Sequence, residues 1–86
     1  MPYLASPECV SCAVDDGTAI LDLRSNTYFS LNDVGATIWD QMSAPASLDD
    51  LTQAVASEYA VPPDACRDDI SDLLEDLLKH GLIQAV

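Results

Sequence analysis

The spacing of apolar residues divides the chain into a first part that favours strands and a second part that favours helices. Residues 18–23 and 27–31 alternate between the two sides of an extended chain, which is the two-residue period of half-buried strands. Residues 9–14 form a further apolar stretch of strand length. Asp15-Asp16-Gly17 is a turn signal in which Gly17 suits a positive φ, and Arg24-Ser25-Asn26 supplies the residues of a second turn. These short connections predict an antiparallel meander with residues 27–31 at one edge.

The chain beyond residue 32 has the 3.6-residue period of amphipathic helices. Apolar residues recur every four positions from Val34 to Met42 and predict a first helix over 33–42, which Asn32 or Asp33 can cap. Ser47 followed by Asp50 is typical of a capping box and predicts the start of a second helix.

A third helix is predicted over residues 64–80, and Gly81 should end it as a C-cap. Its apolar positions follow the spacing i, i+3, i+4, i+7 and i+8 without a miss: Ile70, Leu73, Leu74, Leu77 and Leu78. The predicted fold class is therefore α+β, with a three-stranded antiparallel sheet followed by three helices in a winged helix-turn-helix-like order.

The length of 86 residues suits one domain, which we place at 9–86 after an N-terminal tail of residues 1–8. Pro2 and Pro7 favour an extended tail. No apolar run approaches the roughly 20 residues that span a bilayer, and the first residues lack the pattern of a secretion signal. We therefore expect a cytoplasmic protein that does not enter the membrane.

The charge is strongly acidic, with 15 Asp and Glu residues against 3 Lys and Arg residues and a net charge of -12. Such a chain repels the phosphates of nucleic acids and attracts basic partners. The predicted third helix would be the recognition helix of a winged helix, yet only Arg67 and Lys79 oppose its acids: Asp64, Asp68, Asp69, Asp72, Glu75 and Asp76. DNA binding is therefore disfavoured, while an acidic regulatory or structural subunit stays open as an alternative.

The sequence offers no convincing arrangement for catalysis, a metal or a cofactor. Cys9 and Cys12 have the spacing of a metal knuckle, but residues three apart on a strand point to opposite faces. Cys66 and His80 lie about 21 Å apart on one helix. We therefore interpret the three cysteines as free thiols and expect no enzyme. An acyl carrier is also disfavoured, because Ala46 precedes Ser47 where carriers have an acidic residue.

Residues 21–39, which read Leu-Asp-Leu-Arg-Ser-Asn-Thr-Tyr-Phe-Ser-Leu-Asn-Asp-Val-Gly-Ala-Thr-Ile-Trp, closely resemble the signature of the PqqD-like family. These are the peptide-chaperone domains also called RiPP recognition elements in pathways that make peptides on the ribosome. The later Asp69-Ile70, Leu73-Leu74, Leu77 and Gly81-Leu82-Ile83 resemble the last helix and the ending of the family.

The resemblance implies a non-catalytic binder of precursor leader peptides, like the stand-alone proteins of lasso-peptide clusters. It implies delivery of the precursor to a separate cysteine-type leader peptidase and an ATP-dependent cyclase. The leader would add as a strand to the edge at 27–31, in a groove against helix 64–80, where acidic residues suit a basic leader. The sequence leaves open which margin of that helix faces the strand: the acidic one, with Cys66, Asp69, Leu73 and Asp76, or the other one, with Arg67, Ser71 and Leu78. The expected peptide-binding residues are Thr27, Tyr28, Phe29, Ser30, Leu31, Cys66, Asp69, Ile70, Asp72, Leu73 and Asp76.

Overall fold

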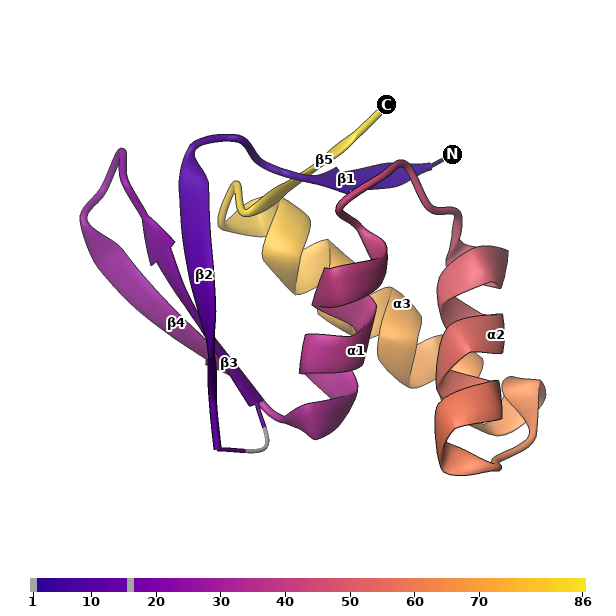
Figure 1. Ribbon diagram of the computed structural model, residues 1–86. Helices are drawn as coiled ribbons and strands as arrows, with labels where there is room; N and C mark the ends of the chain where they lie inside the picture. The colour runs from indigo at the N-terminus through magenta and orange to yellow at the C-terminus, as the bar shows by residue number, and fades with distance from the viewer. Residues whose placement is uncertain (1, 16) are drawn as a thin grey trace.

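A computed structural model describes residues 2–15 and 17–86 and has a sheet layer beside a helical layer (Figure 1). The predicted α+β class, with three antiparallel strands followed by three helices, is confirmed. A small second sheet accompanies them. In chain order the elements are β1 (Tyr3–Ala5), β2 (Cys9–Val14), β3 (Gly17–Asp22), β4 (Thr27–Leu31), α1 (Asp33–Gln41), α2 (Leu48–Tyr59), α3 (Pro63–Lys79) and β5 (Ile83–Ala85).

The larger sheet has the strand order β2-β3-β4, so β4 is an edge strand as predicted. Alternate residues of β3 are buried beneath the helices, namely Thr18, Ile20 and Asp22. The antiparallel register places Phe29 of β4 opposite Ile20. Because side chains alternate along a strand, this register directs Phe29 toward the helices and its neighbour Tyr28 away from them.

The second sheet, in which β1 pairs with β5, was not predicted. It lies within residues that the sequence assigned to the N-terminal tail and to the chain after Gly81. Tyr3 pairs with Ala85, and the backbone of Tyr3 also exchanges two hydrogen bonds with Ala46, at 2.7 and 2.9 Å. Strands of three residues are too short to show a period. Long-range backbone pairing forms this sheet, and it brings the two ends of the chain side by side (Figure 1).

The helix boundaries follow the predicted capping residues closely. The side chain of Asn32 caps α1, and Ser47 and Asp50 form the reciprocal capping box of α2, with both hydrogen bonds at 3.1 Å. After α3, Gly81 has a positive φ of 73°, and the N–H of Leu82 donates to the carbonyl of Leu77 at 2.9 Å. These features make a Schellman ending, which satisfies the last carbonyls of the helix.

Gly17 has a different role from the one its place in a turn suggested. We expected a positive φ there, but Gly17 begins β3, and the positive φ falls on Asp15 at 46°. A Cβ atom at residue 17 would lie 2.0 Å from the carbonyl oxygen of Leu31. The glycine is therefore required for the close approach of two backbones. Asp16 of the same turn lies outside the described residues.

The core lies between the sheet and the three helices. Trp39 on α1 is 6% exposed, and its indole N–H donates to the hydroxyl of Ser11 on β2 at 3.0 Å. This bond lets a large aromatic ring be buried without leaving its polar atom unpaired. The core residues are Ile20, Ile38, Trp39, Met42, Ala46, Leu51, Val55, Ile70, Leu74, Leu77, Leu82 and Ile83.

Asp22 is a buried carboxylate at the end of β3, only 4% exposed. Its Oδ1 accepts hydrogen bonds from the backbone N–H of Arg24 at 3.0 Å and from the Nε of Arg24 at 3.3 Å. Burial alone would raise the pKa of Asp22, but the hydrogen bonds and the positive charge of Arg24 outweigh it, and the pKa is lowered. The charged form is therefore the one that the fold stabilises.

We expect Asp22→Asn to lose a pH-dependent part of the stability. Because the folded pKa lies below the unfolded one, the carboxylate stabilises the fold above its ordinary pKa, and this contribution disappears as the pH falls through the folded value. The difference in urea midpoint between wild type and Asp22→Asn should therefore shrink between about pH 5 and about pH 2. The same change at the exposed Asp68 is the control and should leave the midpoint nearly unchanged at every pH.

Candidate functional site: a groove between an edge strand and a helix

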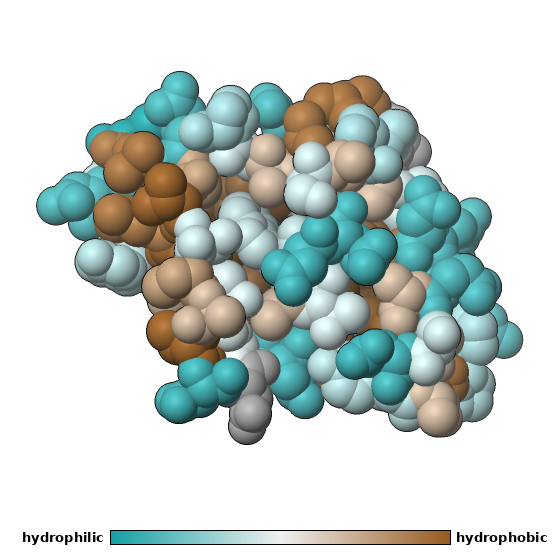
Figure 2. All heavy atoms as spheres, in the orientation of Figure 1, coloured by the Kyte–Doolittle hydropathy of each residue, from teal (hydrophilic) through white to brown (hydrophobic). Residues whose placement is uncertain are grey.

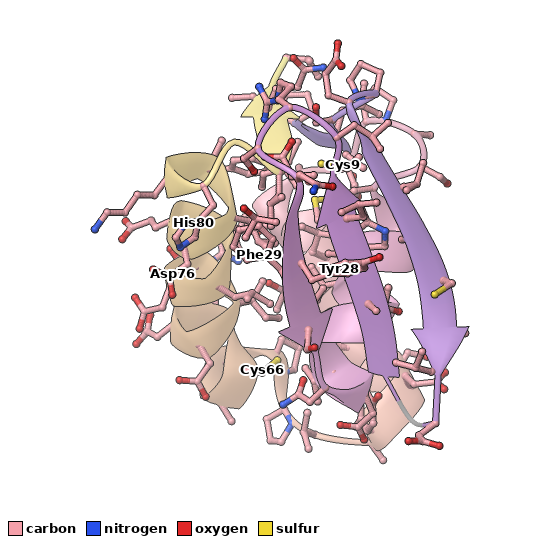
Figure 3. The ribbon with its side chains drawn as sticks, turned by 90° about the vertical axis from the view of Figure 1, so that its left-hand side faces the viewer. Cys9, Tyr28, Phe29, Cys66, Asp76 and His80 are labelled. Atoms are coloured by element: carbon pink, nitrogen blue, oxygen red, sulfur yellow. The ribbon has the colours of Figure 1, made fainter. Side chains whose placement is uncertain are left out.

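The edge strand β4 and the helix α3 form two walls that face each other (Figure 3). One edge of β4 pairs with β3, and no strand in the described ranges 2–15 and 17–86 pairs with the other. The half-buried ring of Phe29 on β4 packs against the ring of His80 at the end of α3, with centroids 5.1 Å apart. A row of backbone N–H and C=O groups therefore borders an aromatic contact between the two walls.

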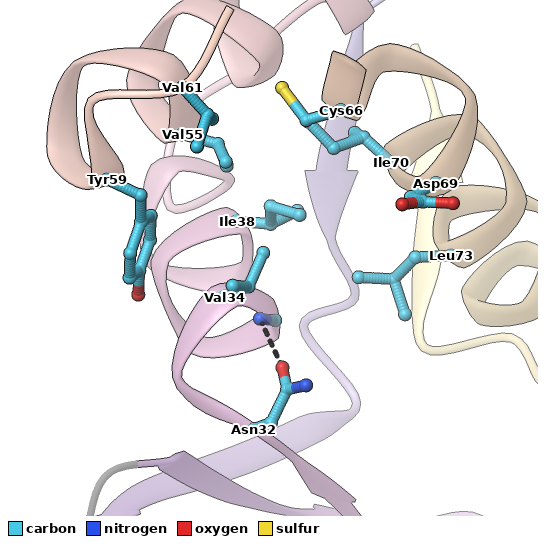
Figure 4. A pocket seen from close by; sticks show the side chains of 11 residues that line it. Asn32, Val34, Ile38, Val55, Tyr59, Val61, Cys66, Asp69, Ile70 and Leu73 are labelled. Carbon is cyan, nitrogen blue, oxygen red and sulfur yellow. Dashed lines mark hydrogen bonds between the residues drawn. The ribbon is translucent and has the colours of Figure 1, made fainter.

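A cavity of about 500 Å³ opens beyond the end of β4, among the three helices (Figure 4). Its wall is mainly apolar, with Asp69 as the charged side chain. The residues that line it are Asn32, Val34, Gly35, Ile38, Val55, Tyr59, Val61, Cys66, Asp69, Ile70 and Leu73. A cavity of this size can take one or two large apolar side chains.

Hydrogen bonds fix the polar groups around this cavity. Asn32 accepts from the N–H of Gly35 at 2.9 Å, which is the N-cap of α1 drawn in Figure 4. The hydroxyl of Tyr59 lies 3.2 Å from that of Thr37, and this bond joins α2 to α1. Since these groups already have partners, they hold the wall in shape, and the cavity presents apolar surface to a ligand.

The structure places the predicted residues of β4 on two different faces. Phe29 and Leu31 are half-buried and lie on the helix side, while Thr27 at the start of the strand is exposed. Tyr28 is 72% exposed and lies with Ser30 on the outer face of the sheet. Tyr28 and Ser30 can therefore offer backbone groups to a peptide at the β4 edge, but their side chains lie outside the groove.

The predicted residues of α3 separate in a similar way. Cys66, Asp69, Ile70 and Leu73 all line the cavity, and Ile70 is also part of the buried core. The exposed Asp72 and Asp76 do not line it.

The margin of α3 that carries Asp69 and Leu73 is the one that borders the cavity. The opposite margin faces α2, because the guanidinium of Arg67 bonds to Asp49 there. The structure therefore places part of the acidic margin, namely Cys66, Asp69 and Leu73, at the cavity.

Sequence reasoning missed part of this site. Three lining residues were not among the expected binding residues: Val55 and Tyr59 of α2, and Val61 of the following loop. His80 was not among the expected binding residues either, although its ring packs on Phe29. A pattern along one helix gives no information on which partner lies across a gap, so these residues carried no separate signal.

The cysteines are three free thiols in different settings. Cys9 is half-buried and Cys12 exposed, on opposite faces of β2 as predicted. Burial, followed by the negative charge of Asp22, raises the pKa of the Cys9 thiol. Within residues 2–15 and 17–86, no group of three His, Cys, Asp or Glu side chains is placed to hold a metal ion, and no helix is long and apolar enough to cross a membrane.

Among the described residues of β2, β3 and β4, the side chains on the outer face of the main sheet are uncharged, although the protein as a whole is strongly acidic. Register places Val10, Leu21 and Tyr28 in one row and Cys12, Ala19 and Ser30 in the next. Val10 is 51% exposed. In Figure 2, apolar side chains (brown) gather at the left, on the side of the molecule where the main sheet lies in Figure 1. A contiguous apolar surface on a chain with a net charge of -12 is typical of a contact surface.

Comparison with known proteins identifies the family. The model of the family described as coenzyme PQQ synthesis protein D (PqqD) matches residues 17–83. The chain therefore belongs to the PqqD family. A search of curated proteins found no match.

Two solved structures have the same fold over nearly the whole chain. TbiB1, in complex with the TbiA(beta) leader peptide, is 29% identical with a TM-score of 0.86, and the match covers 96% of each chain. A lasso peptide synthetase B1, complexed with the leader peptide, is 31% identical with a TM-score of 0.81, and the match covers 96% of this chain and 98% of that one.

Substitutions of two adjacent residues of α3 should distinguish a side chain that borders the groove from one that is buried in the core. Leu74 is 2% exposed, so Leu74→Ala should lower the free energy of unfolding by about 2–5 kcal/mol. Leu73 is only half-buried and lines the cavity, so Leu73→Ala should lower the free energy of unfolding by about 1 kcal/mol. Urea denaturation followed by circular dichroism measures both values. Equal losses would contradict the view that Leu73 borders an open groove.

Proposed function

We propose that this protein is a non-catalytic binder of the leader region of a ribosomally made precursor peptide. The observation that carries the proposal is the free edge of β4 beside the apolar cavity. An extended peptide can complete the hydrogen bonds of such an edge, while side chains on one of its faces enter a pocket. The two similar structures, each solved with a leader peptide, support the same use of this fold.

The peptide would lie between the two walls of the groove. Its backbone would bond to residues 27–31, and its side chains on the helix side would contact Phe29, Leu31 and Leu73. A large apolar side chain would enter the cavity past Cys66 and Ile70. The backbone bonds at the β4 edge and the burial of one or two apolar anchors would together offset the cost of ordering a flexible peptide.

The charge of the protein favours a basic leader. Asp69 lies at the cavity, and Asp72 and Asp76 follow on the exposed side of the same helix. With a net charge of -12, the protein would also speed the encounter with a basic peptide. The protein would meet its precursor in the cytoplasm, where ribosomes make it.

The test is direct binding of the leader encoded by a neighbouring precursor gene. Fluorescence anisotropy of the labelled peptide should give a dissociation constant between micromolar and nanomolar. Asp69→Lys should weaken binding roughly threefold to tenfold, since it reverses a charge at the cavity.

Asp68→Lys is the matched control, because it makes the same charge change at an exposed residue of α3 outside the lining of the cavity. An equal loss in both variants would show that only overall charge matters. If no leader encoded nearby binds to the wild type, the proposed function is wrong.

The uncharged outer face of the sheet supports a second part of the proposal, which is delivery of the bound precursor to maturation enzymes. A separate cysteine-type leader peptidase and an ATP-dependent cyclase are the proposed partners. Tyr28 belongs to β4 itself, so a protein docked on the outer face would lie next to the bound leader. Docking on this face leaves the groove free, because the two surfaces lie on opposite sides of the sheet.

Val10→Asp should leave leader binding unchanged and slow removal of the leader by the peptidase, since it places a charge in the outer face. The control is Val86→Asp, the same change at a residue of similar exposure, 53% against 51%, at the end of the chain. Peptidase assays with purified proteins measure the rate. Normal processing by Val10→Asp would exclude the outer face as the docking surface.

A further inference from the structure

One guanidinium connects the two walls of the groove. Arg24 lies in the turn between β3 and β4, and its Nε donates to the carboxylate of Asp22 at 3.3 Å. Its Nη2 donates to the carbonyl oxygen of Gly81, directly after α3, at 2.7 Å. The bond to Gly81 joins two residues that are 57 positions apart in the chain. The hairpin that ends in the edge strand is thereby tied to the end of the opposite helix.

Both ends of this bridge are held in place. Asp22 is buried and also accepts the backbone N–H of Arg24, so the sheet side of the bridge is rigid. On the helix side, the Schellman ending orients the carbonyl of Gly81. A Cβ at Gly81 would lie 2.7 Å from Nη2, so the guanidinium uses the space that the glycine leaves free.

The bridge lies at the same end of the groove as the aromatic contact between its walls. His80 immediately precedes Gly81, and its ring packs on Phe29 of β4. Holding Gly81 against the hairpin therefore also holds His80 over Phe29. The cavity lies at the other end of the groove, beyond Leu31.

We infer that Arg24 is a positioning residue for peptide binding and sets the separation between β4 and α3. This inference rests on the proposed function, in which a peptide uses both walls at once. The peptide backbone must reach β4 while its side chains pack on α3. If the end of α3 moves away from the hairpin, one of these two sets of contacts weakens. Arg24 acts on the peptide through the spacing of the walls, without touching the peptide.

The experiment measures the dissociation rate of the labelled leader encoded by the neighbouring precursor gene, by stopped-flow anisotropy. Arg24→Gln should raise the dissociation rate constant roughly threefold to tenfold, the effect of losing one partly exposed charged hydrogen bond. Arg67→Gln is the matched control, because it removes the same charge and breaks the bond between α2 and α3. All rates are taken at a temperature where circular dichroism shows each variant folded.

Gly81→Ala disturbs the same contact from the opposite side and leaves the Asp22–Arg24 pair intact, so it serves if Arg24→Gln folds poorly. Gly81→Ala should also raise the dissociation rate constant. In the variant that combines Arg24→Gln with Gly81→Ala, this rate constant should rise by less than the product of the two single increases, because both changes break the same contact. An unchanged rate in folded Arg24→Gln and Gly81→Ala, or an equal rise in Arg67→Gln, would overturn the inference.

A measurement without peptide separates this inference from the proposed function. In the wild type the ring current of Phe29 should shift the NMR signals of the His80 ring protons, and in Arg24→Gln these signals should move toward those of free histidine. If they stay in place, Arg24 does not set the spacing of the walls, and the inference fails whether or not a leader binds. If they move but no leader binds to the wild type, the proposed function fails.

Discussion

The outer backbone edge of β4, which pairs with no strand in the described part of the chain, is the constraint on which the rest of this small protein depends. Exposed N–H and C=O groups on an edge strand can form hydrogen bonds with any extended chain, and an unprotected edge therefore promotes aggregation. Here the edge is short, with five residues, and α3 stands opposite it. A chain that pairs with β4 must also fit against α3. Backbone pairing alone does not distinguish one peptide from another, so contacts with the helix make binding selective for particular side chains.

Much of the fold could be predicted because its signals are local. The period of Ile70, Leu73 and Leu77, the capping box of Ser47 and the turn residues around Asn26 each depend on neighbours within about one turn. The pairing of β1 with β5 could not be predicted, because strands of three residues show no period and these two come from opposite ends of the chain. The family resemblance supplied the connection between edge strand and peptide that periodicity lacks.

The site was predictable to the extent that its residues lie on one element. The spacing of α3 grouped Cys66, Asp69 and Leu73 on one margin, and these residues do line the cavity together. The contributions of Val55 and Tyr59 depend on how α2 crosses α3, which no pattern along either helix contains. The bridge from Arg24 to Gly81 likewise depends on two segments that meet only in the folded chain.

The pairing of β1 with β5 has a consequence for how this domain can be joined to other polypeptide. Because these strands pair antiparallel, residues 3 and 85 are neighbours, and the described chain enters and leaves at one place on the surface. Polypeptide added before or after it would emerge at that place, away from β4 and the cavity. The module can therefore be tethered by either end to another protein, and the two tethers would hold it at nearly the same point, with its groove still open.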